Sequence, residues 1–335
     1  MRTISYRTRQ RVSKSLKITL IVLACLLALL IILVIYLGRF VVYSPDGTYL
    51  DFDRSTALDV QIPPQTEPKS DALPAVSIVY ADPSSQKDET VLTGYYIDYD
   101  MLKQPARTIE AVKALPAPCT VLIDLKSGNG SFYYASNITG AKLADADLDM
   151  IEELLSYLKT NGFTMIARLK TFQDTAFAEA NPDCGIRKKN TDLWVGGSNY
   201  WLQPDNETVI SYLKQIAREL SGKGFREIVF DDFYFPESGQ IVYTSEKTRS
   251  ELIADTAREL LNFFSSSNIM ISFGNPAFDF SVEDSHVFIS GVDGSGVNTT
   301  VNSYPGLKDP AAQIVFLTGS RDTRFEGYQV LRPLY

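Results

Sequence analysis

The chain has 335 residues, with 32 basic and 40 acidic side chains, a net charge of −8 and one histidine, His286. Six of the basic residues precede Ile18 with no acid among them, so the remainder carries −14. An acidic chain of this kind excludes nucleic acid as an expected partner. A single histidine excludes a histidine-rich metal site and limits Ser-His-Asp or Cys-His catalysis to His286, so we expect no metal and no cofactor.

A basic tail, residues 1–17, precedes an apolar segment without a charge, residues 18–37. Twenty helical residues span a hydrocarbon core of about 30 Å and satisfy their backbone hydrogen bonds within the helix. The basic tail predicts a single-pass anchor whose N-terminus is cytoplasmic and whose remaining chain is extracellular. A cleaved signal peptide is the alternative, but its apolar region is usually only about 7–15 residues long.

Residues 38–92 are interpreted as a stalk between the membrane and a folded domain. Within Arg39–Asp53, the turn sequence Pro45-Asp46-Gly47 lies between β-forming residues, which is consistent with a short hairpin. Residues 61–89 are rich in Pro, Ser, Asp and Lys, a composition typical of an extended tether.

From residue 93 to residue 335, apolar runs alternate with amphipathic segments. Most of the runs are almost continuously hydrophobic, as expected for parallel strands buried on both faces. The eight predicted strands are Gly94–Asp100, Thr120–Leu125, Met165–Leu169, Glu227–Phe233, Ile269–Gly274, Val287–Gly291, Ile314–Gly319 and Tyr328–Leu334.

Three segments between these runs carry an apolar stripe at helical spacing: residues 148–158, 209–220 and 253–264. We expect the first to end at Asn161-Gly162 and the second at Gly222, and we expect a further helix over Ile109–Leu115. The pattern predicts an α/β fold of the (β/α)₈ TIM-barrel type, with a doubly wound sheet as the alternative. Only about eight residues separate the last two strands and the sequence ends at the last one, so we expect a barrel trimmed at its C-terminal end.

Active residues of such barrels lie at the carboxyl ends of the strands, and a glycosidase needs two carboxyl groups beside the scissile bond. Asp231 is the predicted catalytic carboxylate, and Asp293, after the sixth strand, is its predicted partner. Asp124 and Lys126 are two residues apart and are expected to share a face, whereas Asp232 should face away from Asp231. The predicted substrate-binding residues are Asp98, Asp124, Lys126, Arg168, Trp201, Asp232 and Tyr234.

The fourth strand resembles a stretch of the bacterial putative glycosyl hydrolase domain family, "GF-x-EI-x-FD" followed by "Y-x-RFP". This chain reads Gly-Phe-Arg-Glu-Ile-Val-Phe-Asp over residues 224–231 and ends the motif in Phe235-Pro236. Residues 123–126 are similar to the family's "IDVK" strand, 165–168 to its "IAR" strand and 201–204 to its "W-V-D-P" element. The resemblance covers about 94–236 and implies a glycosidase-like barrel.

Three differences from the family pattern each remove charge. Tyr234 replaces an arginine, Gln203 replaces an aspartate, and residues 127–130 replace acids. Two functions therefore remain open. The first is a membrane-anchored glycoside hydrolase acting on a polysaccharide, and the second is a non-catalytic envelope protein that binds a cell-wall glycan at the same site. A second carboxylate about 5–10 Å from Asp231 would favour catalysis.

Overall fold

The computed structural model describes four parts of the chain, residues 41–44, 47–50, 93–278 and 285–335. The chain divides into two compact units, Met1–Asp71 and Ala72–Tyr335. In the first unit, β1 (Val41–Ser44) and β2 (Gly47–Leu50) pair antiparallel, as the turn sequence between them predicts. Within the described parts, no helix has the length and apolar character that crossing a membrane requires. The predicted anchor, residues 18–37, lies outside these parts.

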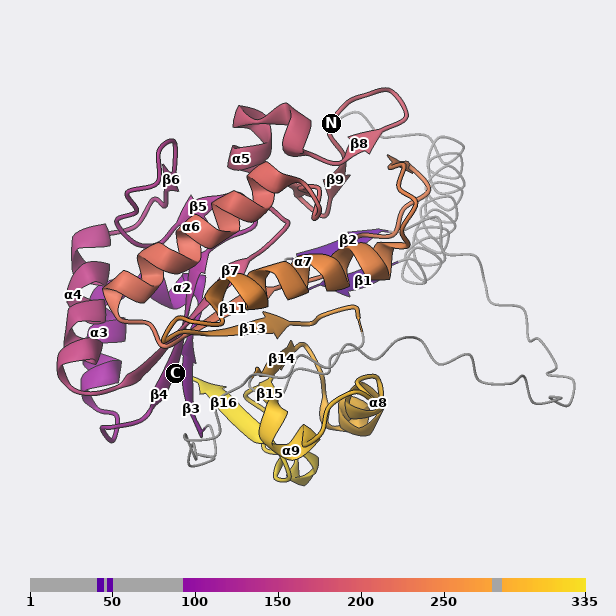
Figure 1. Cartoon of the computed structure of the whole chain (residues 1–335). Helices are drawn as coiled ribbons and strands as arrows, with labels where there is room; N and C mark the ends of the chain where they lie inside the picture. Colours follow the sequence, from indigo (N-terminus) through magenta and orange to yellow (C-terminus); the bar gives the residue numbers. More distant parts are fainter. Residues whose placement is uncertain (1–40, 45–46, 51–92, 279–284) are drawn as a thin grey trace, which may run out of the picture. The chain divides into compact units, whose positions relative to one another are not determined.

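The second unit contains a closed barrel of eight parallel strands. Each strand pairs with the next along the chain, and β16 pairs with β3 to close the barrel; the two strands lie side by side in Figure 1. The barrel strands are β3 (Thr93–Ile97), β4 (Thr120–Lys126), β7 (Thr164–Lys170), β11 (Glu227–Asp231), β13 (Met270–Gly274), β14 (Val287–Ser290), β15 (Ile314–Leu317) and β16 (Gln329–Pro333). All eight predicted strands and the TIM-type fold are confirmed, which excludes the doubly wound alternative.

Helices on the outside of the barrel connect most of the strands (Figure 1). Shorter strands and 3₁₀ turns lie in the loops: β5 (Ser131–Phe132), β6 (Lys142–Leu143), η1 (Pro182–Cys184), β8 (Arg187–Lys188), β9 (Val195–Gly196), β10 (Asn199–Tyr200), β12 (Ile241–Val242) and η2 (Gly294–Gly296). The α-helices are α2 (Tyr99–Leu102), α3 (Pro105–Lys113), α4 (Leu148–Thr160), α5 (Thr175–Ala180), α6 (Glu207–Lys223), α7 (Arg249–Phe264), α8 (Val297–Asn302) and α9 (Pro310–Gln313).

The long helices begin and end at residues that satisfy their terminal backbone groups. Asp147 caps the start of α4, and Thr248 and Glu251 form a reciprocal capping box at the start of α7. The prediction that Gly222 ends α6 is wrong by two residues. The helix ends at Gly224, whose φ of 106° is the left-handed conformation typical of a helix terminus.

The last barrel connection is shorter than the others, as the sequence predicts. Between β15 and β16, the described chain forms only the 3₁₀ turn η3 (Thr323–Phe325), yet the two strands remain parallel. The covering helix that a regular β/α unit would place here is missing, so the barrel is irregular at this position.

Two apolar layers hold the barrel together. The interior contains a small cluster contributed by six strands, formed by Leu122, Ile166, Val229, Phe288, Val315, Leu317 and Leu331. The larger cluster fills the space between the strands and the helices, where the stripes of α4, α6 and α7 are buried. Interior residues that follow this cluster toward the carboxyl ends of β4, β7 and β11 are charged, and these positions form the candidate site.

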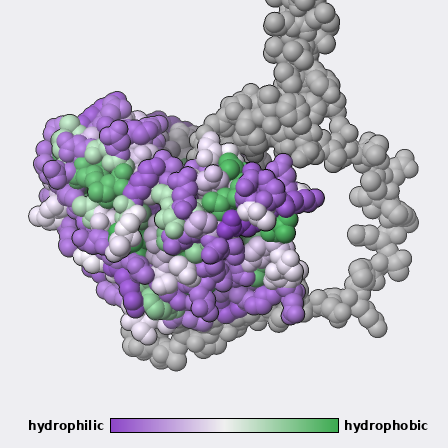
Figure 2. Space-filling view, turned by 90° about the horizontal axis from the view of Figure 1, so that it is seen from above, coloured by the Kyte–Doolittle hydropathy of each residue, from purple (hydrophilic) through white to green (hydrophobic). Residues whose placement is uncertain are grey.

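The surface of the barrel unit is mostly hydrophilic, with small and separate apolar patches on the face that Figure 2 shows. The exposed large hydrophobic residues among the described positions are Leu143, Val195, Val242, Phe263 and Tyr335. These five residues come from segments far apart in the sequence. One of them, Phe263, lines a hollow beside α6 and α7.

Candidate functional site

Asp124 and Arg168 form the first part of the site. They are register partners on the neighbouring strands β4 and β7. Arg168 donates from Nε and Nη2 to the two oxygens of Asp124, at 2.5 and 2.8 Å. Burial raises the pKa of Asp124 in spite of the guanidinium. This bidentate pair fixes the guanidinium of Arg168, a predicted substrate-binding residue, against the acid at the end of the neighbouring strand.

Asp231 ends β11 in register with Lys170 of β7. Its Oδ2 lies 3.3 Å from Lys170 Nζ and 3.9 Å from Arg168 Nη1. Burial alone would raise the pKa of Asp231, which is 3% exposed, but the two cations outweigh burial and lower it. Asp231 Oδ1 is buried and accepts no hydrogen bond from any described residue. A buried oxygen without a hydrogen-bond partner is costly, and native structures hold few of them, which marks Asp231 as a candidate functional residue.

Asp232 corrects a prediction. Strand alternation placed its side chain on the opposite face from Asp231, but β11 ends at Asp231 and Asp232 has a left-handed φ of 50°. This conformation breaks the alternation and brings Asp232 Oδ2 to 2.5 Å from Lys170 Nζ. Its Oδ1 accepts a 3.4 Å hydrogen bond from Asn275, which has a φ of 44°. Two neighbouring non-glycine residues in this strained region are typical of a functional site.

Asp231 and Asp232 share Lys170 as a cation, yet their pKa values are shifted in opposite directions. Burial and the negative charge of Asp231 raise the pKa of Asp232. Although burial opposes it, the two carboxylates raise the pKa of Lys170, which therefore stays charged. The side chain of Asp232 is 14% exposed, against 4% for Asp231. One carboxylate is thus ionised and buried, while its neighbour holds a proton more readily and reaches solvent.

Lys126 is the second correction. The prediction that it shares a face with Asp124 is wrong, because a β-bulge between these residues shifts the register of β4. Lys126 instead points away from Asp124 and is 0% exposed. Its Nζ lies 2.9 Å from Asp174 Oδ2, whose other partner is the hydroxyl of Tyr212. A buried lysine with these partners cannot contact substrate, although it donates to the backbone carbonyl of Lys170 at 2.7 Å.

Asp98 and Asp293 both cap short helices. Asp98 accepts from the backbone amide of Met101 at the start of α2. Asp293 is exposed and accepts from Ser295 Oγ and the Gly296 amide, and these bonds lower its pKa. Within the described parts, neither acid has a contact with Asp231 or Asp232, so their roles in a site stay predictions.

The predicted aromatic residues lie together beside Asp232. Trp201 is 3% exposed and packs against Trp194 and Tyr234, with ring centroids 6.0 and 5.2 Å away. Tyr234 is half-buried, and its backbone amide donates to the carbonyl of Asp232. Trp201 therefore supports the loop, and Tyr234 is the aromatic side chain of this group that remains accessible to a ligand.

Gly274 at the end of β13 is required by the position of Asp231. A Cβ at Gly274 would lie 2.2 Å from Asp231 Oδ1 and 2.9 Å from Asp231 Cα, a clash that rotation of a side chain cannot relieve. We expect Gly274→Ala to lower the unfolding free energy by about 1–3 kcal/mol, as overpacking does. Gly327→Ala is the matched control, because a Cβ there meets nothing within 4 Å. Equal thermal unfolding of both variants would contradict the close contact.

Lys170 and Asn275 also belong to this site, although neither is among the predicted site residues. Each lies at the carboxyl end of a predicted strand, the third and the fifth, and this position could have identified them.

The described residues include no cluster of His, Cys, Asp and Glu suited to holding a metal. What the geometry supplies is a pair of adjacent carboxylates between fixed cations, an arrangement suited to acid and base chemistry.

An eight-stranded parallel barrel with these groups at the carboxyl ends of its strands is a TIM-type barrel with a charged candidate site. The particular family follows from its sequence. Residues 95–285, more than half of the chain, match the family model described as a putative glycosyl hydrolase domain. The chain belongs to this family.

Several solved structures are similar to parts of this chain. A hypothetical protein from Ruminiclostridium thermocellum is 22% identical, with 54% of this chain and 96% of that chain covered and a TM-score of 0.46. A chitobiase from Flavobacterium johnsoniae is 12% identical over 68% and 38%, with a TM-score of 0.46. An alpha-galactosidase from Geobacillus stearothermophilus is 11% identical over 72% and 38%, with a TM-score of 0.47. The chain spans about two fifths of the length of these two glycosidases. No curated protein matches the chain.

Proposed function

We propose that this protein is a glycoside hydrolase that acts on a polysaccharide through Asp231 and Asp232. The observation that carries the proposal is that both carboxylates contact Lys170 Nζ, at 3.3 and 2.5 Å, at the carboxyl end of the barrel. Because both Oδ2 atoms contact the same ammonium group, they lie within about 6 Å of each other, a separation compatible with the closely spaced carboxyl pair of a retaining glycosidase. Membership of a family described as a glycosyl hydrolase domain supports the same reaction class.

The environments of the two acids suggest separate roles. Glycoside hydrolysis needs one carboxyl group to protonate the leaving oxygen and one carboxylate to attack the anomeric carbon or activate water. Asp231, with its lowered pKa, suits the second role. Asp232, with its raised pKa and greater exposure, suits the first. Arg168 and Lys170 would keep Asp231 ionised, and Tyr234 would pack against a sugar ring.

A non-catalytic glycan-binding protein is the second candidate. Its support is that Asp231 is 3% exposed and already paired with two cations, so little of its carboxylate is open to a substrate. Under this alternative, the ion pairs hold the strand ends in place and the sugar contacts only the exposed edge at Asp232 and Tyr234.

A glycan panel separates the two candidates. The soluble fragment Thr93–Tyr335 would be incubated with a range of polysaccharides, and both new reducing ends and retained glycan would be measured. New reducing ends support the hydrolase. Binding without cleavage supports the second candidate, and neither binding nor cleavage of any glycan contradicts both.

The proposed roles predict the pH dependence. Activity requires ionised Asp231, whose pKa is below 3.8, and protonated Asp232, whose pKa is above 3.8. The rate should therefore fall as the pH drops through the first pKa and as it rises through the second, which gives a bell-shaped profile with its optimum between the two. Lys170 lowers both values, so Lys170→Gln should move the whole profile to higher pH. Lys189→Gln, on an exposed side chain, is the control and should leave it unchanged.

We propose further that the barrel is displayed outside the cell on an anchor at residues 18–37. The support is the sequence alone: a basic tail, residues 1–17, precedes twenty uncharged residues. Protease added to intact cells is expected to remove the barrel while leaving cytoplasmic control proteins whole. Protection of the barrel until the cells are lysed would contradict this orientation.

A further inference from the structure

Two adjoining hollows lie at the opposite end of the barrel from the acids. Both are lined by Ser221 of α6, and their volumes are about 260 and 580 Å³. The larger is bordered by Thr164, the first residue of β7, and by Arg226 and Asn268, which precede β11 and β13. Together the hollows form a groove, here called the amino-end groove, along the loops that enter these strands.

The charge of the amino-end groove is opposite to that of the chain. Its lining includes Lys159, Arg218 and Arg226, and no acid lines either hollow. None of these three cations has a carboxylate partner within the described parts of the chain. Residues 18–335 nevertheless carry a net charge of −14. Unpaired charges of one sign in a concave surface focus their field and attract ions of the other sign.

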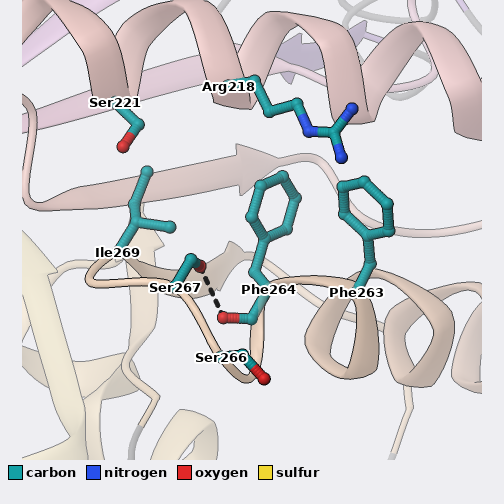
Figure 3. Close-up of a pocket in the computed structure, with 7 residues that line it drawn as sticks. All are labelled: Arg218, Ser221, Phe263, Phe264, Ser266, Ser267 and Ile269. Atoms are coloured by element: carbon teal, nitrogen blue, oxygen red, sulfur yellow. Dashed lines mark hydrogen bonds between the residues drawn. The ribbon is translucent and has the colours of Figure 1, made fainter.

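Aromatic and hydroxyl groups complete the smaller hollow. Figure 3 shows the side chain of Arg218 reaching down from α6 toward the ring of Phe263, with Phe264 beside it. The guanidinium carbon lies 4.4 Å from the centroid of Phe263. Ser267 Oγ donates to the carbonyl of Phe264 at 2.5 Å. Arg218 is thus held by a ring, which leaves its donors free for an anion.

The larger hollow gives a ligand access to the backbone. A Cβ placed at Gly162 or at Gly222 would meet no atom within 4 Å, so both positions face open space. At Gly224, the nearest atoms to such a Cβ are Cδ and Cε of Lys159, both 3.1 Å away. The stem of Lys159 therefore lies across the end of α6, and its ammonium group borders the hollow.

We propose that the amino-end groove binds a linear polyanion that carries phosphate groups. Arg218 lines one hollow, and Lys159 and Arg226 line the other, so the cations are spread over two adjoining hollows, which suits several negative charges better than one ion. Arginine forks bind phosphate oxygens in bidentate geometry, while lysine contributes a point charge. This site is separate from the acids of the opposite rim, so its occupation does not depend on glycan hydrolysis.

Binding of sodium polyphosphate to the full chain in a non-ionic detergent tests this assignment. Gly222→Glu would place a carboxylate in the groove, at a helical position where glutamate is favoured over glycine. Gly239→Glu is the matched control, because a Cβ there also meets nothing within 4 Å. We expect Gly222→Glu to weaken binding at least tenfold and Gly239→Glu to leave it unchanged. Three phosphate contacts should cost roughly 20-fold in affinity between 50 and 200 mM salt.

A second variant keeps the test valid if Gly222→Glu does not fold. Arg226→Gln changes an exposed side chain outside any helix or strand and should also weaken binding. Absence of polyphosphate binding to the unmodified chain would overturn the proposal. Equal affinity in Gly222→Glu, Arg226→Gln and the Gly239→Glu control would overturn it as well, because binding would then not involve the groove.

Discussion

Asp231→Asn is expected to lower kcat by about 100-fold or more, which corresponds to about 3 kcal/mol of transition-state stabilisation. The amide keeps the shape of the carboxylate but cannot act as a nucleophile or base. Folding should be preserved because each cation retains a partner. Lys170 still contacts Asp232 at 2.5 Å, and Arg168 still binds both oxygens of Asp124. Circular dichroism and thermal unfolding would confirm that the variant is folded before its kinetics are compared.

Two further variants decide which acid works with Asp231. If Asp232 carries the proton, Asp232→Asn should lower kcat severely for substrates with poor leaving groups and less for activated ones. Asp293→Asn is the matched control, since its exposed carboxylate bonds only to Ser295 and Gly296 among the described residues. A large loss in Asp293→Asn with a small loss in Asp232→Asn would refute the role of Asp232 and restore the assignment predicted from strand order.

Lys126→Met is expected to destabilise the barrel by about 3–5 kcal/mol, because it leaves Asp174 charged and buried without its cation. Both side chains are 0% exposed. The hydroxyl of Tyr212 and the amide of Phe177 remain as donors to Asp174, but neither carries a charge. For a domain of this size, the loss should lower the unfolding temperature by roughly 10 °C.

An exposed ion pair gives the comparison for this prediction. Lys103→Met removes the partner of Asp100, and both of these side chains are more than half exposed. Pairs of this kind contribute little, so the unfolding temperature should hardly change. Adding Asp174→Asn to Lys126→Met should recover part of the lost stability, because the amide neutralises the orphaned charge and still caps α5. Equal unfolding temperatures for Lys126→Met and Lys103→Met would contradict a buried pair.

The barrel itself could be predicted because its strands are buried on both faces. Such strands appear as almost continuous apolar runs, and amphipathic stripes at helical spacing separate them. The end of α6 shows the limit of this signal. Either Gly222 or Gly224 could end this helix on sequence grounds. Only the structure, with its left-handed φ of 106° at Gly224, identifies which of them does.

The site could be predicted less completely, since two errors came from the assumption of regular strands. A bulge after Asp124 directs Lys126 away from the interior, and the left-handed backbone at Asp232 directs its side chain to Lys170. Each feature depends on how neighbouring strands pair, and neither has a local sequence signature. Placement of Asp231 beside Arg168 and Lys170 was accessible, because parallel strands in register bring their carboxyl ends together.

By itself, the sequence determined the number and order of the barrel strands, the stripes of the covering helices and the short final connection, because burial constrains the polarity of every residue in these segments. Only the tertiary structure decided which strand-end charges meet. Ion pairs such as Asp124 with Arg168 join residues 44 positions apart, and Lys170 with Asp232 joins residues 62 apart. Charge pairing of this range depends on register and on local backbone distortions, which side-chain polarity does not encode.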